Sequence, residues 1–139
     1  MQVKNKVIVV TGGGNGIGAA MCRRFKQEGA RAVVVADIDA KGARQVAKEV
    51  SGIALQTDVS IEADIIRLVD ETEKLYGPID LFCSNAGVAF RDEADGMATS
   101  CPNDNWQKAW EINVMAHVYA ARAVLPSMIA RKEGYLLNT

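Results

Sequence analysis

A glycine-rich loop near the N-terminus reads Thr11-Gly12-Gly13-Gly14-Asn15-Gly16-Ile17-Gly18. It follows the apolar run Val7–Val10, a candidate buried strand, and leads into the helical pattern Ile17–Glu28. Glycines between a strand and a helix permit a tight turn, let the backbone approach a pyrophosphate and let the helix pack closely on the strand. The unpaired N–H groups at the start of a helix also favour an anion. The loop therefore indicates a dinucleotide-binding site, with an ordinary tight turn as the alternative.

Two glycine registers fit this loop. Gly14, Gly16 and Ala19 match the pattern G-x-G-x-x-A, whereas Gly12, Gly16 and Gly18 match T-G-x-x-x-G-x-G. No Lys-Ser or Lys-Thr pair follows the glycines, which excludes a P-loop. Methyltransferases that use S-adenosylmethionine also combine G-x-G with a later acidic strand end, so they remain a third alternative at this point.

Short apolar runs alternate with longer helical patterns along the rest of the chain. The predicted strands are Val7–Val10, Ala32–Ala36, a strand that begins at Ile53 and ends near Asp58-Val59, Ile79–Cys83 and Tyr135–Leu137. The predicted helices are Ile17–Glu28, Ala40–Val50, Ile61–Tyr76 and Trp106–Ala130, the last with Pro126 as a kink or in its final turns. Continuous apolar strands joined by helices predict a parallel sheet that is covered on both faces. We therefore expect an α/β fold, a doubly wound parallel sheet of Rossmann type, with residues 1–139 in one domain.

An acidic residue ends the second predicted strand. Asp37 lies 19 residues beyond Gly18, and a spacing of about 20 is expected for the carboxylate that accepts hydrogen bonds from the adenosine ribose. Such a carboxylate repels the additional 2′-phosphate of NADP. Ile38, which follows it, carries no positive charge that would accommodate this phosphate. The pattern predicts NAD(H), unless Asp37 merely caps the next helix.

Polar residues also follow the third and fourth predicted strands and interrupt the last helix. Asp58-Val59 ends the third strand, where Asp58 competes with Ser60 as a possible cap of the next helix. Ser84-Asn85-Ala86-Gly87 follows the fourth strand, and its glycine allows close approach of the backbone. Asn113 lies among apolar residues in the last helix, where an Asn needs a partner. It is either a satisfied core residue or a functional one.

Together these motifs resemble the short-chain dehydrogenase/reductase family, whose phosphate loop has the T-G-x-x-x-G-x-G spacing. The resemblance favours Gly12, Gly16 and Gly18 as the glycines that work on the phosphates, and it implies NAD as the cofactor. It implies a cofactor site made of Gly12, Asn15, Gly16, Ile17, Gly18, Asp37, Ile38, Asp58, Val59, Asn85, Ala86 and Gly87.

The resemblance also assigns individual roles. It implies that Asp58 meets the adenine amino group, that the main chain of Val59 meets the adenine ring, and that Asn85-Ala86-Gly87 lies along the cofactor's ribose. Asn113 would belong to the catalytic tetrad and hold a water linked to the catalytic Lys. Ser84 stands where the family pattern has Asn, and we expect it to hydrogen-bond the backbone at the strand end.

The chemistry that the resemblance implies is hydride transfer between NAD and a secondary alcohol or ketone. In the family a Tyr takes the alcohol proton, assisted by a Lys four residues later and by a Ser. None of Tyr76, Tyr119 and Tyr135 has such a Lys, and Asn113 is the one tetrad member present. We expect that the natural polypeptide continues beyond the fifth strand and that these 139 residues alone are inactive. The alternative is a non-catalytic nucleotide-binding or interaction module. The motifs at Asn85-Ala86-Gly87 and Asn113 argue against a methyltransferase.

Composition excludes several other classes of function. The net charge of −1 offers no positive field for nucleic acid or an anionic membrane. No stretch approaches the ~18 uncharged apolar residues of a membrane span, and no signal peptide is apparent. The three cysteines, which lack a tight spacing, and the single His117 indicate neither a disulfide framework nor a metal site. These features predict a cytoplasmic protein.

Several further residues carry expectations of their own. We expect Cys83 to be a small buried strand residue, His117 to have no catalytic role, and Trp106 and Trp110 to anchor their helix. The acidic stretch Ala89–Asp104 is either a substrate contact or a solvated loop. The resemblance implies a dimer or tetramer that pairs through the last helix. Four residues could form such a face, although core packing would explain them equally well: Met115, Tyr119, Ala123 and Met128.

Overall fold

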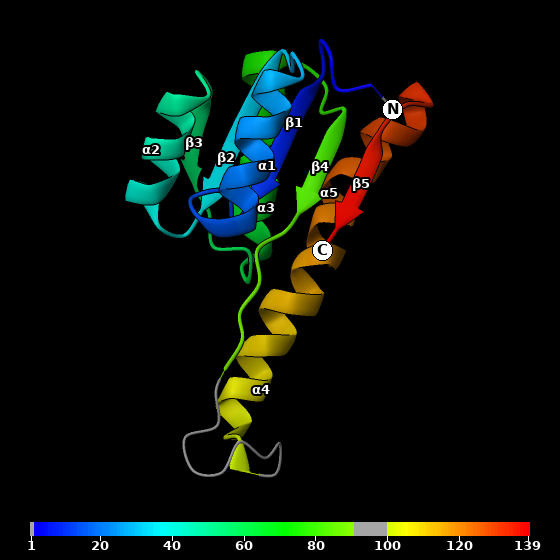
Figure 1. The fold of residues 1–139 in the computed structure, drawn as a ribbon. Coiled ribbons are helices and arrows are strands. Elements are labelled where there is room, and N and C mark those ends of the chain that lie inside the picture. Colours follow the sequence, from blue (N-terminus) through cyan, green and yellow to red (C-terminus); the bar gives the residue numbers. More distant parts are fainter. Residues whose placement is uncertain (1, 91–99) are drawn as a thin grey trace.

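The computed structural model describes residues 2–90 and 100–139. Five parallel strands form one sheet in the order β3-β2-β1-β4-β5 (Figure 1). The chain begins in the centre of the sheet, moves outward to β3, and then returns to the other side of β1. The strands are β1 (Val7–Thr11), β2 (Ala32–Asp37), β3 (Ile53–Gln56), β4 (Leu81–Ser84) and β5 (Tyr135–Asn138). This arrangement confirms the predicted doubly wound fold.

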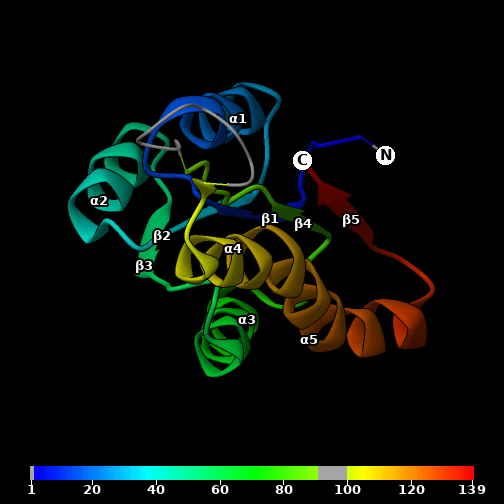
Figure 2. The same cartoon turned by 90° about the horizontal axis from the view of Figure 1, so that it is seen from below.

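Helices cover both faces of the sheet (Figure 2). They are α1 (Gly16–Gln27), α2 (Ala40–Glu49), α3 (Glu62–Tyr76), α4 (Asn103–Trp110), the π-helical turn η2 (Glu111–Met115) and α5 (Ala116–Arg131). Ile8 and Val10 pack into one core cluster with residues of α1 and α2. Val7 and Val9 pack into a second cluster with residues of α3 and α5. The strands are apolar on both sides because both sides are covered.

The last predicted helix is three elements rather than one. It begins at Asn103, widens into a π-turn at η2 and continues as α5, which contains Pro126. α4 extends beyond the carboxyl ends of the strands (Figure 1) and has no buried residue. Trp106 and Trp110 are each 55% exposed, so the expectation that they anchor the helix is wrong. Within the described residues, the core clusters include neither of these two side chains.

Two strand boundaries also differ from the predictions. β4 begins at Leu81 rather than Ile79, and β3 ends at Gln56, before Asp58. The N–H of Ile79 is taken by the Glu73 side chain, at 3.3 Å, and not by a neighbouring strand. Cys83 is fully buried, as expected, and burial raises the pKa of its thiol to about 12.

The face of the last helix that was expected to form an oligomer interface points largely inward. Met128 is buried in the cluster between the sheet and α3. Tyr119 and Ala123 pack against a third cluster, which contains Val59 and Ile65. The structure thus favours core packing for these residues. The outward side of α4, η2 and α5 instead carries an exposed apolar stripe, made of Trp106, Trp110, Val114, Val118, Leu125 and Ile129.

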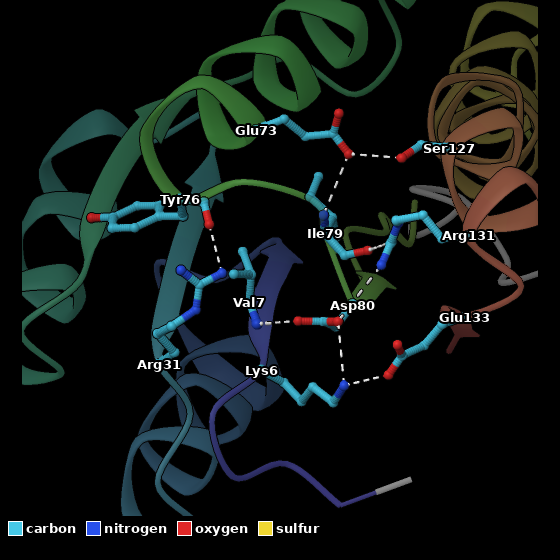
Figure 3. Close-up of polar contacts among 10 residues, drawn as sticks. All are labelled: Lys6, Val7, Arg31, Glu73, Tyr76, Ile79, Asp80, Ser127, Arg131 and Glu133. Carbon is cyan, nitrogen blue, oxygen red and sulfur yellow. Dashed lines mark hydrogen bonds and ion pairs between the residues drawn. The ribbon is translucent and has the colours of Figure 1, made fainter.

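A polar cluster joins the amino ends of the central strands (Figure 3). Asp80 accepts a 2.8 Å hydrogen bond from the N–H of Val7 and lies 3.4 Å from the Lys6 ammonium, which also pairs with Glu133. Arg131, at the end of α5, donates to the Ile79 carbonyl at 2.7 Å. The cluster therefore ties β1, β4 and α5 together at one end of the sheet.

Within the described ranges, no helix is both long and apolar enough to cross a membrane.

Candidate functional site

A cleft of about 440 Å³ opens at the carboxyl ends of the strands, where the strand order reverses between β1 and β4. Ligands of open α/β sheets bind at such reversal points. Every residue expected to bind the cofactor, apart from Gly16, lines this cleft. These lining residues are Gly12, Asn15, Ile17, Gly18, Asp37, Ile38, Asp58, Val59, Asn85, Ala86 and Gly87.

The glycine-rich loop brings α1 close to β1. Gly12 has a φ of +64°, which favours glycine, and a Cβ on Gly18 would lie 2.0 Å from the Gly12 carbonyl oxygen. α1 can therefore meet the loop only because Gly18 lacks a side chain. Gly16 has a φ of +51° and open space around it. Asn15 makes no side-chain capping bond and the first turn has no acidic residue, which leaves the first N–H groups of α1 for an anion.

Thr11 joins the ends of β1 and β4. Its buried hydroxyl accepts hydrogen bonds from the N–H groups of Asn85, at 3.0 Å, and Ala86, at 3.1 Å, and donates to the Cys83 carbonyl at 3.3 Å. The Asn85 amide in turn donates to the Thr11 carbonyl at 3.0 Å. Asn85 is therefore held against β1. Sequence analysis did not single out Thr11, although it heads the T-G-x-x-x-G-x-G pattern.

The Asp37 carboxylate is nearly buried, with 7% of the residue exposed. Its Oδ2 accepts a 2.9 Å hydrogen bond from the N–H of Gly14, and its Oδ1 accepts one of 2.9 Å from the N–H of Asp39. α2 is capped by Asp39, whose side chain accepts from the N–H of Lys41. The alternative that Asp37 caps this helix is therefore wrong, and its carboxylate faces the cleft.

Asp58 forms a turn at the end of β3. Its Oδ1 accepts hydrogen bonds from the N–H and the hydroxyl of Ser60, at 3.0 and 2.7 Å. Ile61 occupies the cap position of α3 without a side-chain bond, so neither Asp58 nor Ser60 is the cap. The N–H of Asp58 donates to Asp64 at 2.9 Å. This bond, with the nearby Arg67, holds the pKa of Asp64 below its ordinary value.

Asn113 lies at the centre of η2, and its side chain hydrogen-bonds to the segment after β4. Its Oδ1 accepts from the N–H of Val88 and its Nδ2 donates to the Val88 carbonyl, each at 2.9 Å. The residue is exposed, so the alternative of a core Asn is wrong. A π-turn inside an α-helix is frequent at functional sites. Asn113 itself does not line the cleft, and its expected link to a catalytic water stays a prediction.

Ser84 makes a different contact from the one expected. Its Oγ lies 2.7 Å from Nδ1 of His117 on α5, so the side chain bonds to another side chain and not to the backbone. The remaining lining residues that sequence analysis missed are Thr57, Val88 and Ile112. Each directly adjoins a predicted residue, and that adjacency was the available signal. The expectation for Ala89–Asp104 concerns residues 91–99 above all, which lie outside the described residues.

Comparisons with known proteins agree with this architecture. The sequence model of the family described as short chain dehydrogenase matches residues 6–139. Short chain aldehyde dehydrogenase 1 from Euphorbia lathyris is 35% identical, over 99% of this chain and 48% of its own length. The NAD-dependent glycerol dehydrogenase of Listeria innocua is 34% identical, over 99% of this chain and 53% of its own.

A solved structure gives the same result. The 3-ketoacyl-(acyl-carrier-protein) reductase of Brucella melitensis, in complex with NADH, superposes with a TM-score of 0.90 and 29% identity, over 98% of this chain and 57% of that one. The fold and the cleft define a Rossmann-type α/β protein. The chain belongs to the short-chain dehydrogenase family. It spans about half the length of the curated relatives that it matches.

Proposed function

We propose that the cleft binds NAD(H). The pyrophosphate would lie at the start of α1, because its first N–H groups lack side-chain partners. The adenosine ribose would lie at Asp37, and the adenine between Ile38 and the pair Asp58-Val59. Asn85-Ala86-Gly87 would lie along the second ribose. The held carboxylate of Asp37 is the observation that carries the proposal, because it is a ready acceptor for ribose hydroxyls.

We further propose that residues 1–139 are the cofactor-binding part of a single oxidoreductase domain. The bound nicotinamide would supply or accept a hydride, and the second reactant would be a secondary alcohol or ketone. The residues of this chain would bind and orient the cofactor. Gly87 lines the cleft beside the expected second ribose, and Asn113 holds the main chain of the neighbouring Val88. No Tyr-x-x-x-Lys pair occurs in the 139 residues. We therefore expect binding without turnover from this chain alone.

The test is a fluorescence titration of the chain with NADH. We expect saturable binding that Asp37→Ala weakens by about tenfold, the effect of losing hydrogen bonds to a charged acceptor. Asp39→Ala, which removes a neighbouring carboxylate outside the cleft, is the matched control and should bind like wild type. Binding of S-adenosylmethionine but not of NADH would contradict the proposal. Turnover of an alcohol by the chain alone would contradict the expected inactivity.

The exposed apolar stripe supports the proposal of a homo-oligomer that pairs through α4, η2 and α5. Ile129 is 69% exposed and Trp110 55%, and exposed apolar patches of this kind mark interaction sites. Sedimentation velocity should show a dimer or tetramer that Ile129→Glu dissociates, whereas Lys132→Glu, outside the stripe, should not. A wild-type monomer at all concentrations would contradict this part.

The buried, free thiols of Cys22 and Cys83 support a cytoplasmic location.

A further inference from the structure

The Asp37 carboxylate is directed by the main chain of two other segments. Oδ2 is bound to the N–H of Gly14 in the glycine-rich loop, and Oδ1 to the N–H of Asp39 before α2. A carboxylate has about four acceptor positions, and these two bonds use two of them. The side chain is thus fixed in direction while each oxygen can still accept a second hydrogen bond.

The reason for a glycine at position 14 differs from the reason at positions 12 and 16. Gly12 and Gly16 have positive φ angles and Gly14 does not. A Cβ on Gly14 would instead lie 2.9 Å from Oδ2 of Asp37 and 3.0 Å from the main-chain nitrogen of Ala43. The position is therefore small because the carboxylate and α2 come close to it, and not because the backbone needs glycine.

We propose that Gly14 is a specificity-determining residue of the cofactor site. Its bare N–H holds Asp37 in the place where the carboxylate accepts hydrogen bonds from the ribose and repels a 2′-phosphate. This inference rests on the proposed NAD(H) site and names a residue outside the glycines that the family spacing assigns to the phosphates. A side chain at position 14 would displace the carboxylate, because the end of a side chain moves more easily than the main chain of α2.

Gly14→Ala should therefore change selectivity as well as affinity. With the carboxylate displaced, NADH loses a fixed acceptor and should bind about tenfold more weakly, as expected for a lost hydrogen bond to a charged group. NADPH loses a repulsive charge at the same time and should be affected less. The ratio of the two dissociation constants, NADPH over NADH, should fall by roughly the same factor.

The experiment titrates NADH and NADPH into wild type, Gly14→Ala, Gly13→Ala, Asp37→Ala and the double variant Gly14→Ala/Asp37→Ala. Gly13→Ala is the matched control, because its Cβ would strain the same loop while its three nearest atoms, the closest at 2.9 Å, belong to Val35, Val10 and Cys22 and not to Asp37. A partly unfolded variant raises both apparent dissociation constants by one common factor. The ratio therefore reports selectivity even where a variant is less stable.

The inference holds if Gly14→Ala lowers the ratio, Gly13→Ala leaves it unchanged, and Gly14→Ala has no further effect on the ratio once Asp37 is Ala. Equal weakening of NADH and NADPH by Gly14→Ala would overturn it, as would the same change of ratio in the Asp37→Ala background. Failure of the wild type to bind NADH is a different outcome, since it would contradict the proposed function itself.

Discussion

His117 and Ser84 are joined by a 2.7 Å hydrogen bond although 33 residues separate them in sequence. The contact connects α5 to the last residue of β4, immediately before Asn85. Ser84 is only 3% exposed, so its hydroxyl is closed to substrates, and the pair is not a nucleophile with its base. The bond instead fixes the strand end that leads into the cleft.

Removing either partner of this pair should destabilise the fold. We expect Ser84→Ala to lower the free energy of unfolding by about 1 kcal/mol, because the half-buried imidazole loses its partner. His117→Asn, which retains polar atoms near Nδ1, should retain more stability than His117→Leu. Urea unfolding of the single and double variants measures the coupling. Strictly additive losses would show that the hydrogen bond contributes nothing.

Gly18→Ala should disturb the cleft more than Gly16→Ala. The new Cβ would lie 2.0 Å from the Gly12 carbonyl oxygen, so α1 must move, at a cost of about 1–3 kcal/mol. Gly16→Ala adds its Cβ to open space and should cost only about 1 kcal/mol for the positive φ. Thermal melts and NADH titrations of both variants check this order, and a reversed order would refute it.

Asp80→Asn should weaken the amino end of the sheet. The carboxylate accepts from the N–H of Val7 and attracts Lys6 and Arg131, so its neutralisation should cost about 1–3 kcal/mol. Glu133→Gln removes a more exposed charge that pairs with the same lysine, and we expect a loss below about 1 kcal/mol. Unfolding free energies in urea distinguish the two, and equal effects would contradict the central place of Asp80.

Stability at acidic pH should depend on Asp64. The N–H of Asp58 and the Arg67 guanidinium hold the pKa of Asp64 below its ordinary value in the folded state. The resulting stabilisation is present above the unfolded-state pKa of about 4 and is lost as pH falls through the folded pKa. Asp64→Asn should therefore be less stable than wild type at pH 7, with the difference shrinking below about pH 4. A constant difference from pH 7 to pH 2 would exclude this role.

Much of the fold and of the cleft could be predicted because the signals are local. Gly18 and Asp37 lie at a fixed spacing on one strand-helix-strand unit, and the parallel sheet follows from apolar strands alternating with helices. The contacts of Thr11 with Asn85 and of Ser84 with His117 could not be predicted, because they join residues that only the tertiary fold brings together. The π-turn around Asn113 has no periodic signature, and the exposure of Trp110 depends on how far α4 extends past the sheet.

The two ends of the sheet carry different kinds of residues. The Asp80 cluster gathers charged side chains at the amino ends of the strands, whereas the cleft lies at the carboxyl ends. Substitutions at sites without shared partners usually have additive effects on stability. Substitutions that stabilise the Asp80 cluster can therefore compensate for destabilising substitutions in the cleft. Natural or laboratory evolution could change the ligand preference of the cleft in this way without unfolding the protein.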